Sequence, residues 1–217
     1  MSTPFRKAII SVTLCAMLSL ALWPAFHSPA IPMDEGMLLV YPELLLKGRL
    51  PYRDFELITG PADPLILATA YAGFGTNIFV ERSVGLVYRI LIVAAVFGIA
   101  QRWSVFIATG CVLVAGILLG GTDLWANTWY AGVAFALSSL WATANIAQRG
   151  RCLAGGFLAG MACLARCDFG PGLILALLPL FLAMTQMKKL HFLVGGVLRC
   201  FPVGLADVCD RPGADSS

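Results

Sequence analysis

Residues 84–121 read VGLVYRILIVAAVFGIAQRWSVFIATGCVLVAGILLGG, and this stretch decides the fold. It holds two apolar runs, Val84–Ala100 and Val105–Gly121, on either side of a short polar turn that contains Arg102. A helix needs about 20 mostly apolar residues to cross the hydrocarbon core of a bilayer. The stretch therefore predicts two membrane-spanning helices joined by a tight turn.

The composition extends this prediction to the whole chain of 217 residues, which is 59% hydrophobic and only 12% charged. A typical soluble domain is about 25% charged, and the mean hydropathy of +0.84 points the same way. We therefore expect an all-α, polytopic transmembrane helix bundle that forms a single domain over residues 1–217, and we exclude a soluble globular domain. No basic run indicates a nucleic-acid partner. The seven cysteines show no zinc-type spacing, so we expect no metal site and no cofactor, and leave dependence on a divalent metal open.

Other apolar runs supply the remaining segments of this bundle. The strong candidates are Ala8–Phe26, Thr128–Ala147, Cys152–Ala165 and Gly172–Met187, and the weak ones are Pro64–Val80 and Leu190–Val208. Glycine pairs at helical spacing, Gly116/Gly120 and Gly156/Gly160, suit close contact between helices, and chance spacing in a glycine-rich chain explains them equally well. The first run also fits a signal peptide, but the polytopic body that follows favours an uncleaved helix.

Basic residues favour the cytoplasmic side of a membrane, and they predict the orientation of the bundle. They gather in four short places, which are Arg6/Lys7, Arg102, Arg149/Arg151 and Lys188/Lys189. If all four lie on one side, only two crossings fit between residues 7 and 102. We therefore expect Pro64–Val80 to be re-entrant or interfacial. The chain is then a multi-pass protein of the plasma (inner) membrane with a cytoplasmic N-terminus.

This orientation places the long polar loop His27–Asp63 outside the cytoplasm, together with most carboxylates of the chain. Apolar residues recur near helical spacing between Gly36 and Gly48, which indicates an amphipathic helix on the membrane surface. Asp34 and Glu35 come just before it. An acidic residue there can simply cap the helix. It can also act as a general base that activates a hydroxyl or amine.

Several short motifs occur in a characteristic order from about residue 5 to residue 187. They are Met33-Asp34-Glu35-Gly36, then Leu46 to Phe55 with Gly60-Pro61, then Phe74-Gly75 with Glu81-Arg82, and finally Gly155 to Ala162 leading to Arg166-Cys167-Asp168. In this order they resemble membrane glycosyltransferases of the GT-C fold, in particular the protein O-mannosyltransferase and aminoarabinose-transferase-like group.

The resemblance implies an inverting transfer of a sugar from a polyprenyl-phosphate donor to a glycan, lipid or protein acceptor on the extracytoplasmic face. By motif position it implies Asp34 as the catalytic base, with Glu35 as its neighbour or alternative. The leaving phosphate needs positive charge, for which the forked donors of arginine are suited. The candidates are Arg53, Arg82 and Arg89.

Some candidate residues have more than one interpretation. Arg89, inside an apolar run, can instead extend to the outer interface. Asp123 and Trp129 can form an acceptor or sugar site, or Trp129 can belong to an ordinary aromatic belt. For Arg166 and Asp168 we favour a pair with each other at a helix end over a role in catalysis.

The chain also departs from the family, whose members are longer and often carry an external domain. We therefore expect an N-terminal fragment, and its activity is in doubt. The same helices also fit a non-enzymatic membrane protein, either a small transporter or a scaffold subunit, in which the acidic loop only caps and solubilises. Against a transporter, the sequence places no carboxylate in the middle of a membrane segment.

Overall fold

The computed structural model describes residues 13, 16, 17, 20, 22–27, 34–144 and 149–197. Apart from an isolated bridge between Pro51 and Phe55, every regular element in these ranges is a helix, which confirms the all-α class. The elements are a short 3-10 helix, η1 (Trp23–His27), and the α-helices α2 (Asp34–Leu46), α3 (Ala62–Phe74), α4 (Ile78–Ala100), α5 (Val105–Gly120), α6 (Thr128–Ala144), α7 (Arg149–Ala165), α8 (Phe169–Ala183) and α9 (Gln186–Val197).

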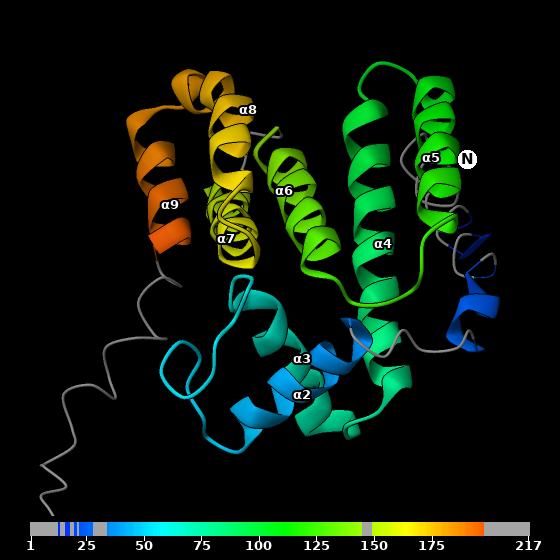
Figure 1. Cartoon of the computed structure of the whole chain (residues 1–217). Coiled ribbons are helices and arrows are strands. Elements are labelled where there is room, and N and C mark those ends of the chain that lie inside the picture. Colours follow the sequence, from blue (N-terminus) through cyan, green and yellow to red (C-terminus); the bar gives the residue numbers. More distant parts are fainter. Residues whose placement is uncertain are drawn as a thin grey trace, which may run out of the picture.

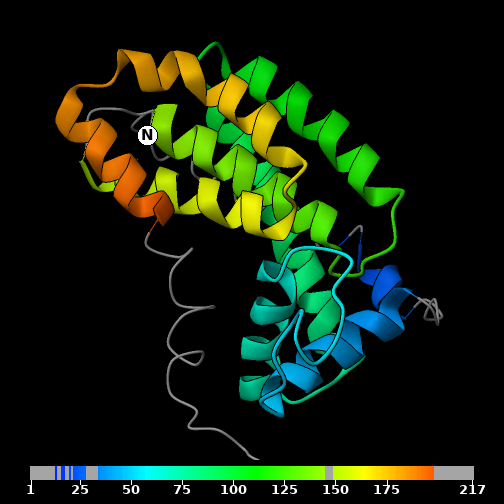
Figure 2. The same ribbon diagram turned by 60° about the vertical axis from the view of Figure 1, so that its left-hand side comes forward.

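The helices form two groups (Figure 1). Helices α4 to α9 make the bundle, and α2 and α3 lie together at one end of it, beside the first turns of α4. Figure 2 shows the same separation from another side. The α4–α5 and α8–α9 connections lie at the opposite end of the bundle. The chain thus gathers the segment predicted to carry the chemistry at one end, away from Arg102 and Lys188.

Local signals explain where the helices begin and end. The side chains of Asn77 and Ser104 cap α4 and α5 by accepting hydrogen bonds from the backbone N–H groups of Phe79 (3.0 Å) and Phe106 (3.2 Å). Gly75 ends α3 with a φ of 84°, a left-handed conformation that glycine adopts without steric cost. Such caps fix the boundaries of α4 and α5 because they satisfy backbone donors that the helix leaves unpaired.

Two predicted segment boundaries are wrong for this reason. Pro64–Val80 is not one segment, because Gly75 separates α3 from α4. Helix α4 begins at Ile78 rather than at Val84, so Glu81 and Arg82 lie inside it. Helix α3, with 13 residues, is about 20 Å long, which is too short for a hydrocarbon core of about 30 Å.

The ends of two other predicted segments also differ. Gly172–Met187 is divided between α8 and α9, and within Leu190–Val208 α9 ends at Val197, the remainder lying outside the described residues. Of Ala8–Phe26, only residues 13, 16, 17, 20 and 22–26 are described, and Thr128–Ala147 is described as far as Ala144.

Helix α2 forms where a surface helix was predicted and continues through Pro42, but it is not amphipathic in the expected sense. The charged Glu35 is buried, whereas the apolar side chains of Met37 and Val40 are 40% and 52% exposed. Its outward side therefore carries apolar side chains together with Glu43, which is 41% exposed and pairs with Lys47.

One helix in the described part of the chain, α4, is long and apolar enough to cross a membrane. Three shorter apolar helices follow it in the sequence, and they lie within α5, α7 and α8. The outward faces of α5 and α8 are apolar: Phe106 is 88%, Ile117 75% and Leu175 71% exposed. Exposing apolar faces of this kind to water would be energetically unfavourable.

The glycine pairs have different outcomes. Gly156 and Gly160 lie against α9, where a Cβ on Gly156 would come within 1.9 Å of the Phe192 carbonyl oxygen, so the predicted close contact is confirmed. Gly116 and Gly120 have nothing within 4 Å of an added Cβ in the described structure, which favours chance spacing for this pair. The close contact of α7 with α9 thus depends on glycine, which lets the two backbones meet.

Candidate functional site

The first feature of the site is a buried ion pair between Glu35, in the first turn of α2, and Arg82, in the second turn of α4. The Arg82 Nη2 lies 3.0 Å from Glu35 Oε1, and the two side chains are 3% and 5% exposed. Arg82 Nη2 and Nε also donate to the carboxylate at 3.0–3.2 Å, which makes the pair bidentate. Residues 47 positions apart in the sequence are thereby fixed together.

Arg82 also holds the segment that precedes α2. Its Nη1 donates to the backbone carbonyl oxygens of Ala25 (3.1 Å) and Phe26 (2.7 Å) in η1. One guanidinium thus joins η1, α2 and α4. Asp34 is the first residue of α2, directly before Glu35, and its side chain lies outside the described residues. The contacts of Arg82 therefore fix the backbone on both sides of residues 28–34.

Arg89 lies two turns further along α4 and is completely buried. Its Nη1 donates to the carbonyl oxygens of Gly85 (2.9 Å) and Trp125 (3.3 Å), and its Nη2 donates to the carbonyl oxygen of Asp123. The guanidinium also lies 4.0 Å above the Tyr130 ring. These contacts attach the α5–α6 connection to α4. Arg89 does not extend to the surface. Inside the protein, backbone carbonyl oxygens take the place of water as acceptors for its hydrogen bonds.

Two buried carboxylates lie in the same region and were not singled out from the sequence. The Tyr88 hydroxyl donates to Asp63 Oδ1 at 2.7 Å, and the backbone N–H of Ala126 donates to Glu81 Oε1. The other oxygen of each carboxylate has no partner within the described residues. Burial raises the pKa of the Asp63 carboxyl to about 7; the charge of Glu81 raises it further, and the Tyr88 hydrogen bond acts against the rise.

The sequence gives a weak signal for these two residues. Asp63 stands between Pro61 and Pro64 at the start of an apolar run, and Glu81 precedes Arg82 directly. Neither position reveals burial, because the partners Tyr88 and Ala126 are 25 and 45 residues away.

The loop between α2 and α3 returns to the bundle and touches the end of α7. The backbone N–H of Gly60 donates to the Ala165 carbonyl oxygen at 3.1 Å. Within the loop, Asp54 accepts from the Leu50 backbone N–H (2.8 Å) and from Arg53 Nε (3.2 Å). The Leu50 hydrogen bond, and then the charge of Arg53, lower the pKa of the Asp54 carboxyl. Arg53 remains more than half exposed, with 55% of its side chain accessible.

A cavity of about 470 Å³ lies between this loop and the α7–α8 connection, and we call it the polar cup. Its lining comes from Tyr52, residues 57–61, residues 163 and 164, and the Arg166, Cys167 and Asp168 triplet. The Arg166 Nη2 lies 2.8 Å from Asp168 Oδ2, which confirms the predicted pair. The Arg166 hydrogen bond holds the pKa of the Asp168 carboxyl below its ordinary value.

Trp129 belongs to the wall behind this cup rather than to a site with Asp123. The Arg166 guanidinium lies 4.4 Å above the Trp129 ring, and Phe169 packs edge-on against the same ring at 5.3 Å. Asp123 has an exposed side chain on the α5–α6 connection, where its backbone carbonyl contacts Arg89. The structure thus brings Trp129 to Arg166, and gives no contact of Trp129 with Asp123 in the described residues.

In the described part of the chain, no three His, Cys, Asp or Glu side chains are grouped so that they could hold a metal ion. No family model, no curated protein and no solved structure matches this chain.

Proposed function

We propose that this chain is a multi-pass membrane glycosyltransferase that transfers a sugar from a polyprenyl-phosphate donor to an acceptor on the extracytoplasmic face. The observation that carries the proposal is the buried Glu35–Arg82 ion pair, with its further bonds to the carbonyls of Ala25 and Phe26. A buried charge pair at the start of α2 is expensive to build. Its effect is to hold the backbone of Asp34 in one place.

A fixed position matters for the role that we assign to Asp34. As general base, its carboxylate takes the proton from an acceptor hydroxyl or amine while the oxygen or nitrogen attacks the anomeric carbon. The bond between that carbon and the lipid phosphate oxygen then breaks, and the sugar is transferred with inversion. Proton transfer requires a base within hydrogen-bond reach of the acceptor. A base on a firmly anchored helix end meets that requirement better than one on a free loop.

The bilayer is the second element of the proposal. Because α5 and α8 expose apolar faces, we place α4 to α9 in the membrane with α2 and α3 at the extracytoplasmic surface. The connections that carry Arg102 and Lys188 lie at the opposite end, which is the cytoplasmic end by the distribution of basic residues. The exposed apolar side chains of α2, Met37 and Val40, then rest against the outer leaflet.

The three arginines receive different roles in this proposal. Arg82 acts on Asp34 through Glu35 and is a positioning residue. Arg89 holds the α5–α6 connection to α4 by its bonds to carbonyls. Arg53, which is exposed beside Asp54, is the one of the three that can approach a donor phosphate directly.

The decisive experiment is the substitution Asp34→Asn, assayed by sugar transfer from a lipid-linked donor in membranes that contain the chain. Asn caps a helix as well as Asp does, but it cannot act as a base. We expect transfer to fall by about 10²–10⁴ while folding is kept. Glu56→Gln, an exposed carboxylate of the same loop, is the control and should transfer normally. Full activity of Asp34→Asn would remove the assignment.

A proton-coupled carrier is the second candidate, and the buried carboxylates favour it. Glu81 lies within α4, the helix of membrane-spanning length, and one of its oxygens has no partner in the described structure. Buried carboxylates in membrane segments often carry protons. Proton uptake into vesicles that contain the chain, lost in Glu81→Gln but kept in Asp34→Asn, would favour this function over sugar transfer.

A further inference from the structure

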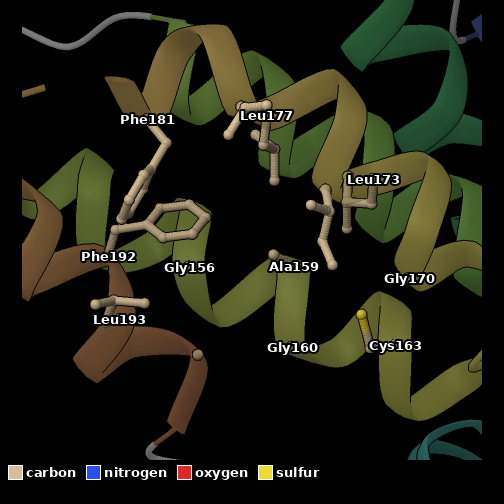
Figure 3. Close-up of a pocket in the computed structure, with 13 residues that line it drawn as sticks. Gly156, Ala159, Gly160, Cys163, Gly170, Leu173, Leu177, Phe181, Phe192 and Leu193 are labelled. Carbon is tan, nitrogen blue, oxygen red and sulfur yellow. The ribbon is translucent and has the colours of Figure 1, made fainter. Parts of the chain in front are cut away.

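An apolar groove runs along the outside of α7, α8 and α9 and has a volume of about 440 Å³ (Figure 3). Gly156, Ala159 and Gly160 of α7 form its floor, and the side chains of Leu173 and Phe181 of α8 reach into it. Phe192 and other residues of α9 close one side. A groove with this lining has no polar atoms to hold water, so hydrocarbon is the favoured filling.

The groove and the polar cup are neighbours, because Cys163 lines both cavities. Along α8 the groove extends from Gly170 to Phe181, which is about 16 Å at the rise of an α-helix. An extended chain in the groove therefore leads to the α7–α8 connection, where Arg166 and Asp168 lie. The shape is that of a site for a molecule with a long apolar chain and a polar head.

Arg166 is the cation of the polar cup, and its ion pair with Asp168 orients it there. Asp168 binds its Nε and Nη2, and Trp129 supports one face of the guanidinium. Its Nη1 has no hydrogen-bond partner among the described residues, so two N–H donors on a preoriented cation remain for a ligand. Arginine held in this way is suited to phosphate oxygens.

We propose that the α7–α9 groove and the polar cup together bind one lipid phosphate, with the apolar chain in the groove and the phosphate on Arg166. The inference deepens the proposed function, on which the choice of a polyprenyl chain rests. It adds a phosphate-binding residue that the sequence pattern assigned only to a pair with Asp168. The site lies at the same end of the bundle as α2 and α3, the end to which we assign transfer.

The test measures binding of radiolabelled undecaprenyl phosphate to the full chain purified in detergent, with undecaprenol as the uncharged probe. Arg166→Gln should weaken binding of the phosphate by about 10- to 100-fold, the loss expected for hydrogen bonds to a charged group, and leave binding of undecaprenol unchanged. Arg151→Gln, the same change near the other end of α7, is the matched control.

The groove is tested separately by filling it. Ala159→Phe should weaken binding of both probes, and Leu175→Phe, on the exposed side of α8, should weaken neither. Each variant is first checked for an unchanged melting temperature. Normal binding in a correctly folded Ala159→Phe would overturn the groove assignment, and equal losses for both probes in Arg166→Gln would overturn the phosphate assignment.

Competition identifies the source of the phosphate. Displacement by unlabelled undecaprenyl phosphate supports the donor lipid, and equal displacement by phosphatidylglycerol would overturn this choice, because the site would then accept any bilayer phospholipid. Displacement by inorganic phosphate alone would overturn the proposal, because the apolar chain of the lipid would then contribute nothing to binding. The Asp34→Asn variant should bind the lipid normally. Its transfer and binding are measured separately, so a failure of the proposed glycosyl transfer can be distinguished from a failure of the proposed lipid site.

Discussion

Replacing Arg82 by Met tests whether the ion pair with Glu35 organises the end of the molecule that holds α2 and α3. The substitution keeps an apolar chain of similar length but removes every donor of the guanidinium. Glu35, with 5% of its side chain exposed, would lose its cation, and the carbonyls of Ala25 and Phe26 would lose a donor. Removing one partner of a buried pair typically costs about 3–5 kcal/mol.

The assay is thermal unfolding of the purified chain in detergent. For a chain of this size, 1 kcal/mol corresponds to about 2–4 °C, so Arg82→Met should lower the Tm by roughly 6–20 °C. The double variant Arg82→Met with Glu35→Gln should recover part of this loss, since the stranded charge is then absent. Arg53→Met, which breaks an exposed pair, is the control and should cost at most about 1 kcal/mol.

Two outcomes would refute this reasoning. The first is an Arg82→Met variant that melts within the range of Arg53→Met, because burial would then contribute nothing to the pair. The second is a double variant that loses the full sum of the two single changes, because Glu35 and Arg82 would then act independently.

Three further predictions use other parts of the structure. Native Asp63 keeps its proton up to about pH 7, whereas the unfolded chain releases it near pH 3.8. The native state therefore binds more protons in this window, and the free energy of unfolding should fall as the pH rises through it, by at most about 1.4 kcal/mol per pH unit. Asp63→Asn should flatten this dependence in melting curves recorded from pH 4 to 8, and an unchanged slope would contradict the assignment. Gly156→Leu should destabilise the bundle by about 1–3 kcal/mol or more through overpacking, while Gly116→Leu should stay within about 0.5 kcal/mol in the same assay. In a cysteine-free background, a cysteine at Asp123 should react with an impermeant thiol reagent from outside, and one at Arg151 should react only after the membrane is opened; the reverse pattern would invert the orientation.

The apolar runs predicted the helices of the bundle because the residues that begin and end each helix lie next to the run in the sequence. Val105–Gly121 was predicted almost to the residue, since Ser104 caps the helix and its interior has no charge to interrupt it. The start of α4 was missed because the predicted segment began at Val84, after the charged residues Glu81 and Arg82, where the uninterrupted apolar run starts. They are helical because each finds a partner far along the chain, Glu35 for Arg82 and Ala126 for Glu81.

The candidate site was predicted in its members but not in its pairings. The motifs pointed to Glu35 and Arg82 separately, and assigned Arg82 to a phosphate. Only three-dimensional proximity shows that the two residues neutralise each other. Trp129 was likewise placed with Asp123, its neighbour in sequence, whereas packing places it under Arg166. Local patterns report helices, but contacts between helices depend on the whole fold.

The hydrogen bond from Gly60 to Ala165 also has a consequence for biosynthesis. The two residues are about 105 positions apart, which at about 5–20 residues per second means a delay of roughly 5–20 s during synthesis. Until α7 has been synthesised, the loop that ends at Gly60 has no partner to which it can bind. The polar cup is therefore assembled late, after most of the chain has been made.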